Sequence, residues 1–127
     1  MRRTLILTLA VLTCALAVCA FSRATLNDTV EDARQLRAQA LLAENDGDVE
    51  RAGALLSQLA QLWQDKAVLL EKLASHDALH DVATAIAEAK ICLECLDHDD
   101  FLRTMSTVEM GLNHLKDEEA VRWENLY

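Results

Sequence analysis

The order of apolar and polar positions divides the chain into an apolar start and four amphipathic stretches. The apolar start, Thr4 to Phe21, holds eighteen residues and no charged side chain. Beyond it, apolar residues recur at alternating spacings of three and four, the period of a helix with one buried face. The pattern predicts an all-α fold, in which an N-terminal transmembrane helix is followed by an antiparallel up-down helical bundle of about four helices.

The apolar segment is long enough to cross a membrane. Eighteen helical residues span about 27 Å, close to the roughly 30 Å hydrocarbon core of a bilayer. Arg2 and Arg3 precede it, which favours a single-pass anchor in the cell membrane with a cytoplasmic N-terminus and an extracytoplasmic domain. Two alternatives stay open: a signal peptide cleaved near Ala20, which would release a secreted domain, and a lipoprotein modified at Cys19.

The remaining pattern divides the chain into residues 1–23, an anchor or signal segment, and residues 24–127, an acidic helical bundle domain. Helices are expected over residues 25–44, 49–74 and 75–96 and from residue 101 onward. Gly47 suits a left-handed turn, and Asp48 and Ser75 suit N-caps. Asp117 is expected to cap a short final segment that carries Trp123 and Leu126. The predicted core positions are Leu26, Val30, Ala33, Ala40, Ala52, Leu55, Leu56, Leu59, Leu62, Trp63, Leu69, Leu70, Leu73, Leu79, Val82, Ile86, Ala89, Leu93, Leu96, Phe101, Met105, Val108, Leu112 and Leu115.

Composition supports long helices and restricts the choice of partners. There is no proline and there are only three glycines, so the main helix breakers are nearly absent. Without Arg2 and Arg3, ten basic residues face twenty-one acidic ones, which gives the domain a formal charge of −11. Such a charge disfavours nucleic acid and anionic lipid surfaces, because both are bound through cationic patches.

The order of several short features resembles a known family. A basic start and one apolar span precede a Gly-Asp turn at Gly47, a helix with Trp63, His76 followed by an acid, and a late Asn125-Leu126. In this order and length the chain resembles the family called domain of unknown function 4363. The resemblance implies a small bacterial protein anchored in the membrane with a helical domain. It implies no activity, cofactor or catalytic residue.

Two pairs of residues have the spacing of metal ligands, His76-x3-His80 and Cys92-x2-Cys95. If residues 75–96 form one helix, His76 and Cys92 lie about 24 Å apart along its axis, too far to share an ion. Cys92, Cys95 and His98 are spaced by three, so on a helix they fan out rather than converge. We therefore expect no metal site, with these three as the remaining candidates.

Cys92 and Cys95 also invite a redox or disulfide interpretation. A Cys-x2-Cys redox centre normally begins a helix, where the dipole stabilises a thiolate, whereas this pair falls near a helix end. Acidic clusters do not match a calcium loop, because an EF-hand starting at Asp97 would place Phe101 at its fifth position. There is no phosphate-binding loop or nucleophile elbow, and a slim helical bundle is expected to offer little concavity.

These observations predict a membrane-anchored helical domain that acts without catalysis, as a protein-interaction or structural module. Its partner would be another membrane protein or a second copy of the chain. Trp123 and Leu126 are candidate contacts. The alternative function is a thiol redox or metal-binding protein that uses Cys92 and Cys95.

Overall fold

The computed structural model describes the backbone of residues 1–72 and 74–125 and the side chains up to residue 118, Leu73 excepted. This part of the chain folds into four helices and no strand: α1 (Arg2–Asn45), α2 (Val49–Glu71), α3 (His76–Glu94) and α4 (His98–Asn125). The predicted all-α class and helix number are therefore confirmed. The predicted N-caps are also confirmed, since Asp48 accepts a hydrogen bond from the Arg51 amide and Ser75 from the Ala78 amide.

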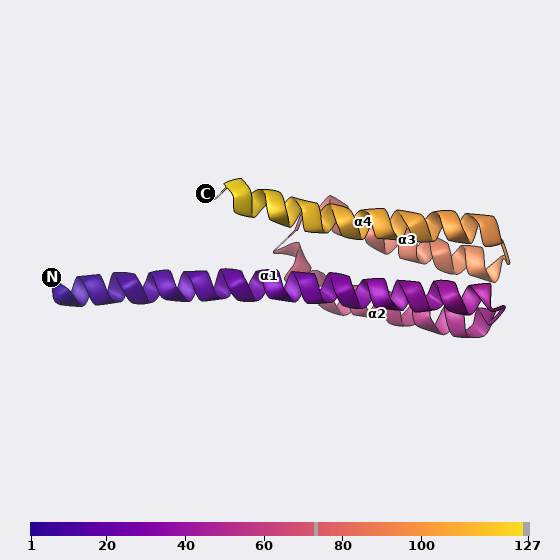
Figure 1. Cartoon of the computed structure of the whole chain (residues 1–127), viewed down its shortest axis with the longest axis horizontal. Helices are drawn as coiled ribbons and strands as arrows, with labels where there is room; N and C mark the ends of the chain where they lie inside the picture. The colour runs from indigo at the N-terminus through magenta and orange to yellow at the C-terminus, as the bar shows by residue number, and fades with distance from the viewer. Residues whose placement is uncertain (73, 126–127) are drawn as a thin grey trace.

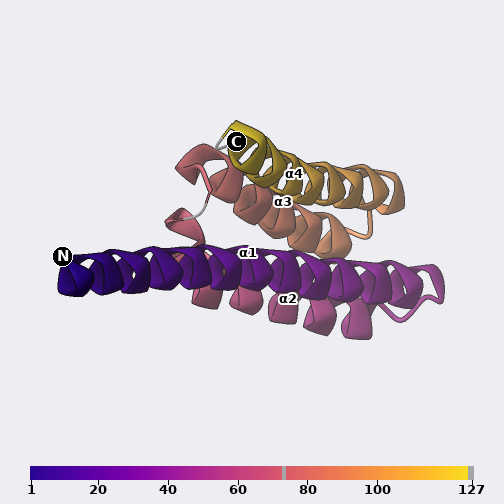
Figure 2. The ribbon, with the colours of Figure 1, turned by 60° about the vertical axis from the view of Figure 1, so that its left-hand side comes forward.

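The four helices form two antiparallel hairpins, α1–α2 and α3–α4, that lie one on the other (Figures 1 and 2). Each helix contacts its two neighbours around the bundle, and the contact between α1 and α4 is the least extensive. The α1–α2 and α3–α4 turns lie at the same end, which we call the far end (Figure 1). The α2–α3 connection lies at the opposite, near end, which faces the apolar segment.

Helix α1 continues without a break from the apolar segment into the bundle. Its first part extends beyond the other helices (Figure 1), and residues 1–21 are exposed along their whole length. Buried residues begin at Leu26. By length and composition α1 is a candidate membrane span, a description that a signal sequence also meets. The expected domain boundary after residue 23 thus falls inside one continuous helix.

The core forms where the amphipathic pattern placed it. All predicted core positions with described side chains are buried except three. Leu62 and Leu69 are partly buried, and Leu96 is exposed. Phe101, Leu26, Leu56 and Leu59 are among the largest side chains that are fully buried. Leu73 lies outside the described residues.

Two expectations about the chain's turns and ends are wrong. Leu96 was expected in the core but is 75% exposed, because α3 ends at Glu94 and Leu96 takes a left-handed φ of 56° that turns it off the apolar stripe. Asp117 does not begin a new segment, since α4 runs through it to Asn125. An aspartate that could cap a helix does not end one when the neighbouring residues favour helix and no glycine or proline intervenes. The side chains of Trp123 and Leu126 lie outside the described residues.

Polar side chains bond across the two interfaces between the hairpins, α1–α4 and α2–α3, which we call the seams. Arg37 of α1 donates through Nε to the Met105 carbonyl of α4 at 2.8 Å. The Arg34 Nε lies 3.3 Å from a Glu109 carboxylate oxygen on the same seam. On the opposite seam, the buried Trp63 of α2 donates its indole N–H to the Leu79 carbonyl of α3 at 3.1 Å. The two hairpins are thus held in register along both of the seams between them.

Candidate functional site

A groove of about 420 Å³ runs between α2 and α3 on the outside of the bundle. Buried Trp63, Leu79 and Ile86 lie at its floor, and most of its exposed surface is apolar. Small side chains along both helices leave the space open. The lining residues are Ala60, Trp63, Gln64, Ala67, Glu71, His76, Leu79, His80, Ala83, Ile86, Ala87 and Lys90.

The end of this groove nearest the apolar segment carries Glu71, His76 and His80, and the other polar lining residues are Gln64 in the middle and Lys90 toward the far end. The rings of His76 and His80 stack with centroids 6.4 Å apart, and His76 Nδ1 lies 3.8 Å from a Glu71 carboxylate oxygen. Because α1 and α2 are antiparallel and turn at Gly47, Glu71 lies at about the level of Arg23 on α1. This end of the groove is therefore next to the boundary of the apolar segment.

The two turns at the far end share one backbone motif. In each, the two amides after the C-cap residue bond back to helix carbonyls: Gly47 to Glu44 and Asp48 to Ala43 in the first turn, with the same pattern in the second. The central residue must be left-handed, and it is Gly47 (φ 82°) in the first turn but Leu96 (φ 56°) in the second. A leucine there costs roughly 1–2 kcal/mol relative to a residue without a Cβ.

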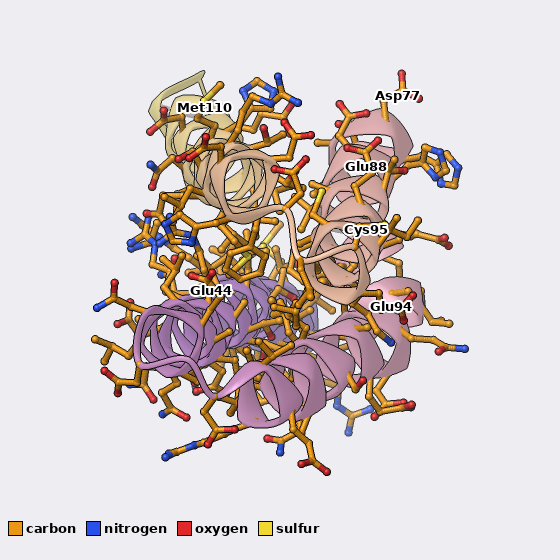
Figure 3. The ribbon with its side chains drawn as sticks, turned by 90° about the vertical axis from the view of Figure 1, so that its right-hand side faces the viewer. Glu44, Asp77, Glu88, Glu94, Cys95 and Met110 are labelled. Atoms are coloured by element: carbon orange, nitrogen blue, oxygen red, sulfur yellow. The ribbon has the colours of Figure 1, made fainter. Side chains whose placement is uncertain are left out.

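A hydrogen-bonded pair joins the two turns across the far end. His98 Nδ1, at the start of α4, lies 2.5 Å from Glu44 Oε1, at the end of α1. In Figure 3, which looks at the bundle from this end, Glu44 lies on the side of α1 that faces α4. The Glu44 hydrogen bond, and then its charge, raise the pKa of His98 above the ordinary histidine value. The pair thus bridges the hairpins when His98 is protonated.

A pH dependence of stability follows from this pair. A histidine whose pKa is higher in the folded state stabilises the fold fully below its unfolded value of about 6.5, and that contribution is lost as pH rises through the folded pKa. Replacing His98 with Gln is expected to lower the urea midpoint at pH 6 and to have a smaller effect at pH 9. The control His80→Gln removes an exposed histidine away from Glu44. An equal loss at both pH values for His98→Gln would contradict the role of its charge.

The candidate ligands found in the sequence do not come together. Cys92 is half-buried and lies 3.8 Å from the Thr104 hydroxyl, Cys95 is exposed at the end of α3, and His98 faces Glu44. Both thiols are free, so a disulfide between them is not formed. Figure 3 shows Cys95 at the end of α3. Within the described residues no three His, Cys, Asp or Glu side chains are placed to hold a metal ion.

The sequence contained signals for the groove and for the strained turn that pattern reading missed. The expectation of little concavity overlooked that Ala60 and Ala67 on α2 lie opposite Ala83 and Ala87 on α3, where larger residues would close the seam. The pair Leu96-Asp97 repeats the position of Gly47-Asp48 at the end of a helix. Only the backbone shows that the two pairs form the same left-handed turn, because leucine is rare at a left-handed position.

The fold and its surfaces define a class of protein, an up-down four-helix bundle that continues from an exposed apolar N-terminal helix. Within that class, the chain belongs to the family described as Domain of unknown function (DUF4363), whose model matches residues 20–126. The resemblance noted in the sequence is thereby confirmed. The match covers the bundle and leaves out most of the apolar segment. No curated protein and no solved structure matches the chain.

Proposed function

We propose that this protein is a membrane-tethered, non-enzymatic interaction module that stands outside the cytoplasm and contacts a protein partner through its far end. The apolar part of α1 is the tether, and Arg2 and Arg3 hold its N-terminus on the cytoplasmic side. The partner is another membrane protein or a second copy of the chain. The surfaces on which the proposal rests offer apolar contact area, so no catalytic step is invoked.

The continuity of α1 supports a tether that also sets distance. From Phe21 at the end of the apolar segment to Asn45 at the far end there are twenty-four helical residues, or about 36 Å. Since no turn interrupts α1, the far end is held at that height instead of moving on a flexible linker. A site at the far end would therefore contact partners that extend to that fixed height above the bilayer.

The exposed, left-handed position of Leu96 is the observation that carries the proposal. Its side chain is 75% exposed, and its backbone is left-handed at a position where the equivalent turn has a glycine, Gly47. A large apolar side chain kept at a strained, mostly solvent-facing position costs stability and gains little packing within the chain. Strain of this kind is commonly retained where a residue has a role in binding.

Other exposed apolar side chains extend this surface. Beyond residue 21, seven large apolar residues with described side chains are exposed, and five of them lie in the half of the bundle toward the far end. Scattered exposed apolar residues are ordinary, but a concentration at one end favours an interaction site there. The five are Leu42, Val49, Ile91, Leu96 and Leu102.

The test is photocrosslinking in cells with a photoreactive amino acid at Asp99, which is exposed in the first turn of α4. We expect a discrete adduct in the native chain and its loss in Leu96→Gly. The same substitution should raise the unfolding free energy by about 1 kcal/mol, because glycine takes the left-handed position without strain. Weaker crosslinking in a more stable protein cannot be attributed to unfolding.

The photoreactive group at Glu88, exposed in the middle of α3, serves as the matched control and should give no discrete adduct. An adduct of twice the chain's mass would identify a second copy as the partner. If crosslinking at Asp99 is diffuse, or is unchanged by Leu96→Gly, the far end is not an interaction site.

A further inference from the structure

We propose that the groove between α2 and α3 takes one acyl chain of a zwitterionic phospholipid from the adjacent leaflet, with the headgroup at His76, His80 and Glu71. This inference rests on the tether of the proposed function but concerns a different surface and a different ligand. Four properties of the groove lead to it: its place, its size, its lining and the charge of its near end.

The groove begins where the membrane surface would be. If Thr4–Phe21 spans the hydrocarbon core, Arg23 is in the headgroup layer, which adds roughly 5–8 Å on each side of the core. Glu71 lies at about the same level as Arg23, and His76 follows directly after the α2–α3 connection. One tail of a lipid in the leaflet can therefore enter the groove while the headgroup stays in the headgroup layer.

The size of the groove fits a single chain better than a protein helix. From Ala60 to Glu71 the groove covers eleven helical residues, or about 16 Å. Its volume of about 420 Å³ lies within the range of roughly 300–1,000 Å³ found for small-molecule sites. A helix about 10 Å across would fill roughly 1,250 Å³ over the same length, so it could only rest on the rim.

The lining matches an apolar tail over most of the length. Trp63, Leu79 and Ile86 form a buried apolar floor, and four alanines form the walls. The one polar atom of Trp63 is occupied by the Leu79 carbonyl, so the small exposed part of its ring offers the groove only apolar surface. Covering such a surface with a hydrocarbon chain is favourable in proportion to the apolar area removed from water.

The near end suits a headgroup that carries both signs of charge. The imidazoles of His76 and His80 can donate to phosphate oxygens, while the carboxylate of Glu71 attracts a quaternary or primary amine. An anionic lipid would instead meet the field of a domain whose formal charge is −11. These charges favour a zwitterionic lipid over an anionic one.

The test uses the full chain in nanodiscs of phosphatidylcholine, with Trp123→Phe so that Trp63 is the only tryptophan. Trp63 lies eight residues from Glu71, about 12 Å above the level of the headgroups. Bromine atoms on lipid tails quench tryptophan only on contact, so tails confined to the bilayer would leave Trp63 bright. We expect discs of tail-brominated phosphatidylcholine to remove most of its fluorescence relative to unbrominated discs.

A variant that fills the groove provides the control. Ala83→Phe places a ring in the groove from an exposed position and should restore the fluorescence, whereas Thr84→Phe, exposed on the same helix but outside the groove, should not. Helical circular dichroism and the melting temperature of both variants should equal those of the parent. Quenching that Ala83→Phe leaves unchanged, or no quenching in brominated discs, would overturn the proposal.

A second arm adds tail-brominated fatty acid to the protein in unbrominated discs. Quenching there alone would overturn the assignment to a bilayer lipid. A chain that does not enter nanodiscs at all would remove the tether, and with it both this inference and the membrane part of the proposed function. A chain that enters them without quenching would remove this inference only, and crosslinking at the far end would be unaffected.

Discussion

Replacing Gly111 with leucine is expected to destabilise the bundle by about 2–3 kcal/mol, because the side chain overpacks the α3–α4 interface. A Cβ at position 111 would lie 2.6 Å from Cγ2 of Val82. Val82 is buried, and its short branched side chain has little freedom to move aside. The measurement is the urea unfolding free energy, which should fall without a large change in the slope of the transition.

Two comparisons isolate the cause. Met110→Leu places the same residue one position earlier, on an exposed site of α4, and should change stability by less than about 0.5 kcal/mol. In a double-mutant cycle, Gly111→Ala combined with Val82→Ala should cost at least about 1 kcal/mol less than the sum of the single changes, since the smaller residue at position 82 removes the clash. Strict additivity would show that Val82 does not limit position 111.

Leu12→Arg is expected to remove most of the chain from the membrane fraction. Leucine at the centre of a spanning helix is favourable by about 0.3–0.6 kcal/mol and arginine unfavourable by about 2.5–3.5 kcal/mol, a difference of roughly 3–4 kcal/mol. That difference shifts the partition between membrane and water on the order of a hundredfold or more. The measurement is the share of chain that sediments with membranes after an alkaline wash.

The matched control is Leu42→Arg, the same substitution on the same helix. Leu42 is 65% exposed and lies in the part of α1 that belongs to the bundle, outside the apolar segment. Its replacement should therefore leave membrane retention unchanged. If the two variants behave alike, retention does not depend on the apolar segment.

Much of the fold could be predicted because one physical signal dominates it. Apolar residues spaced by three and four identified the core of each helix, from Leu26 in α1 to Leu115 in α4, and the shortage of glycine and proline indicated long helices. Caps could be read where a side chain makes its own hydrogen bond to the backbone, as Asp48 and Ser75 do. These are local interactions, so a single sequence contains them.

The features that failed depend on backbone geometry or on distant contacts. Leu96 fits the apolar stripe by spacing, yet the turn rotates it to the surface. The pairing of Glu44 with His98 joins residues fifty-four positions apart, and no local pattern announces it. The groove arises from which alanines face each other across α2 and α3, and that depends on the register of two helices.

The intact mass of the chain recovered from alkaline-washed cell membranes tests the tether most directly. An uncleaved anchor predicts that the chain stays with the membranes and has the unmodified mass of all 127 residues. A chain found in the wash or the medium, or one shortened by about the first twenty residues as a signal peptidase would leave it, would contradict a bundle held at the bilayer by its first helix.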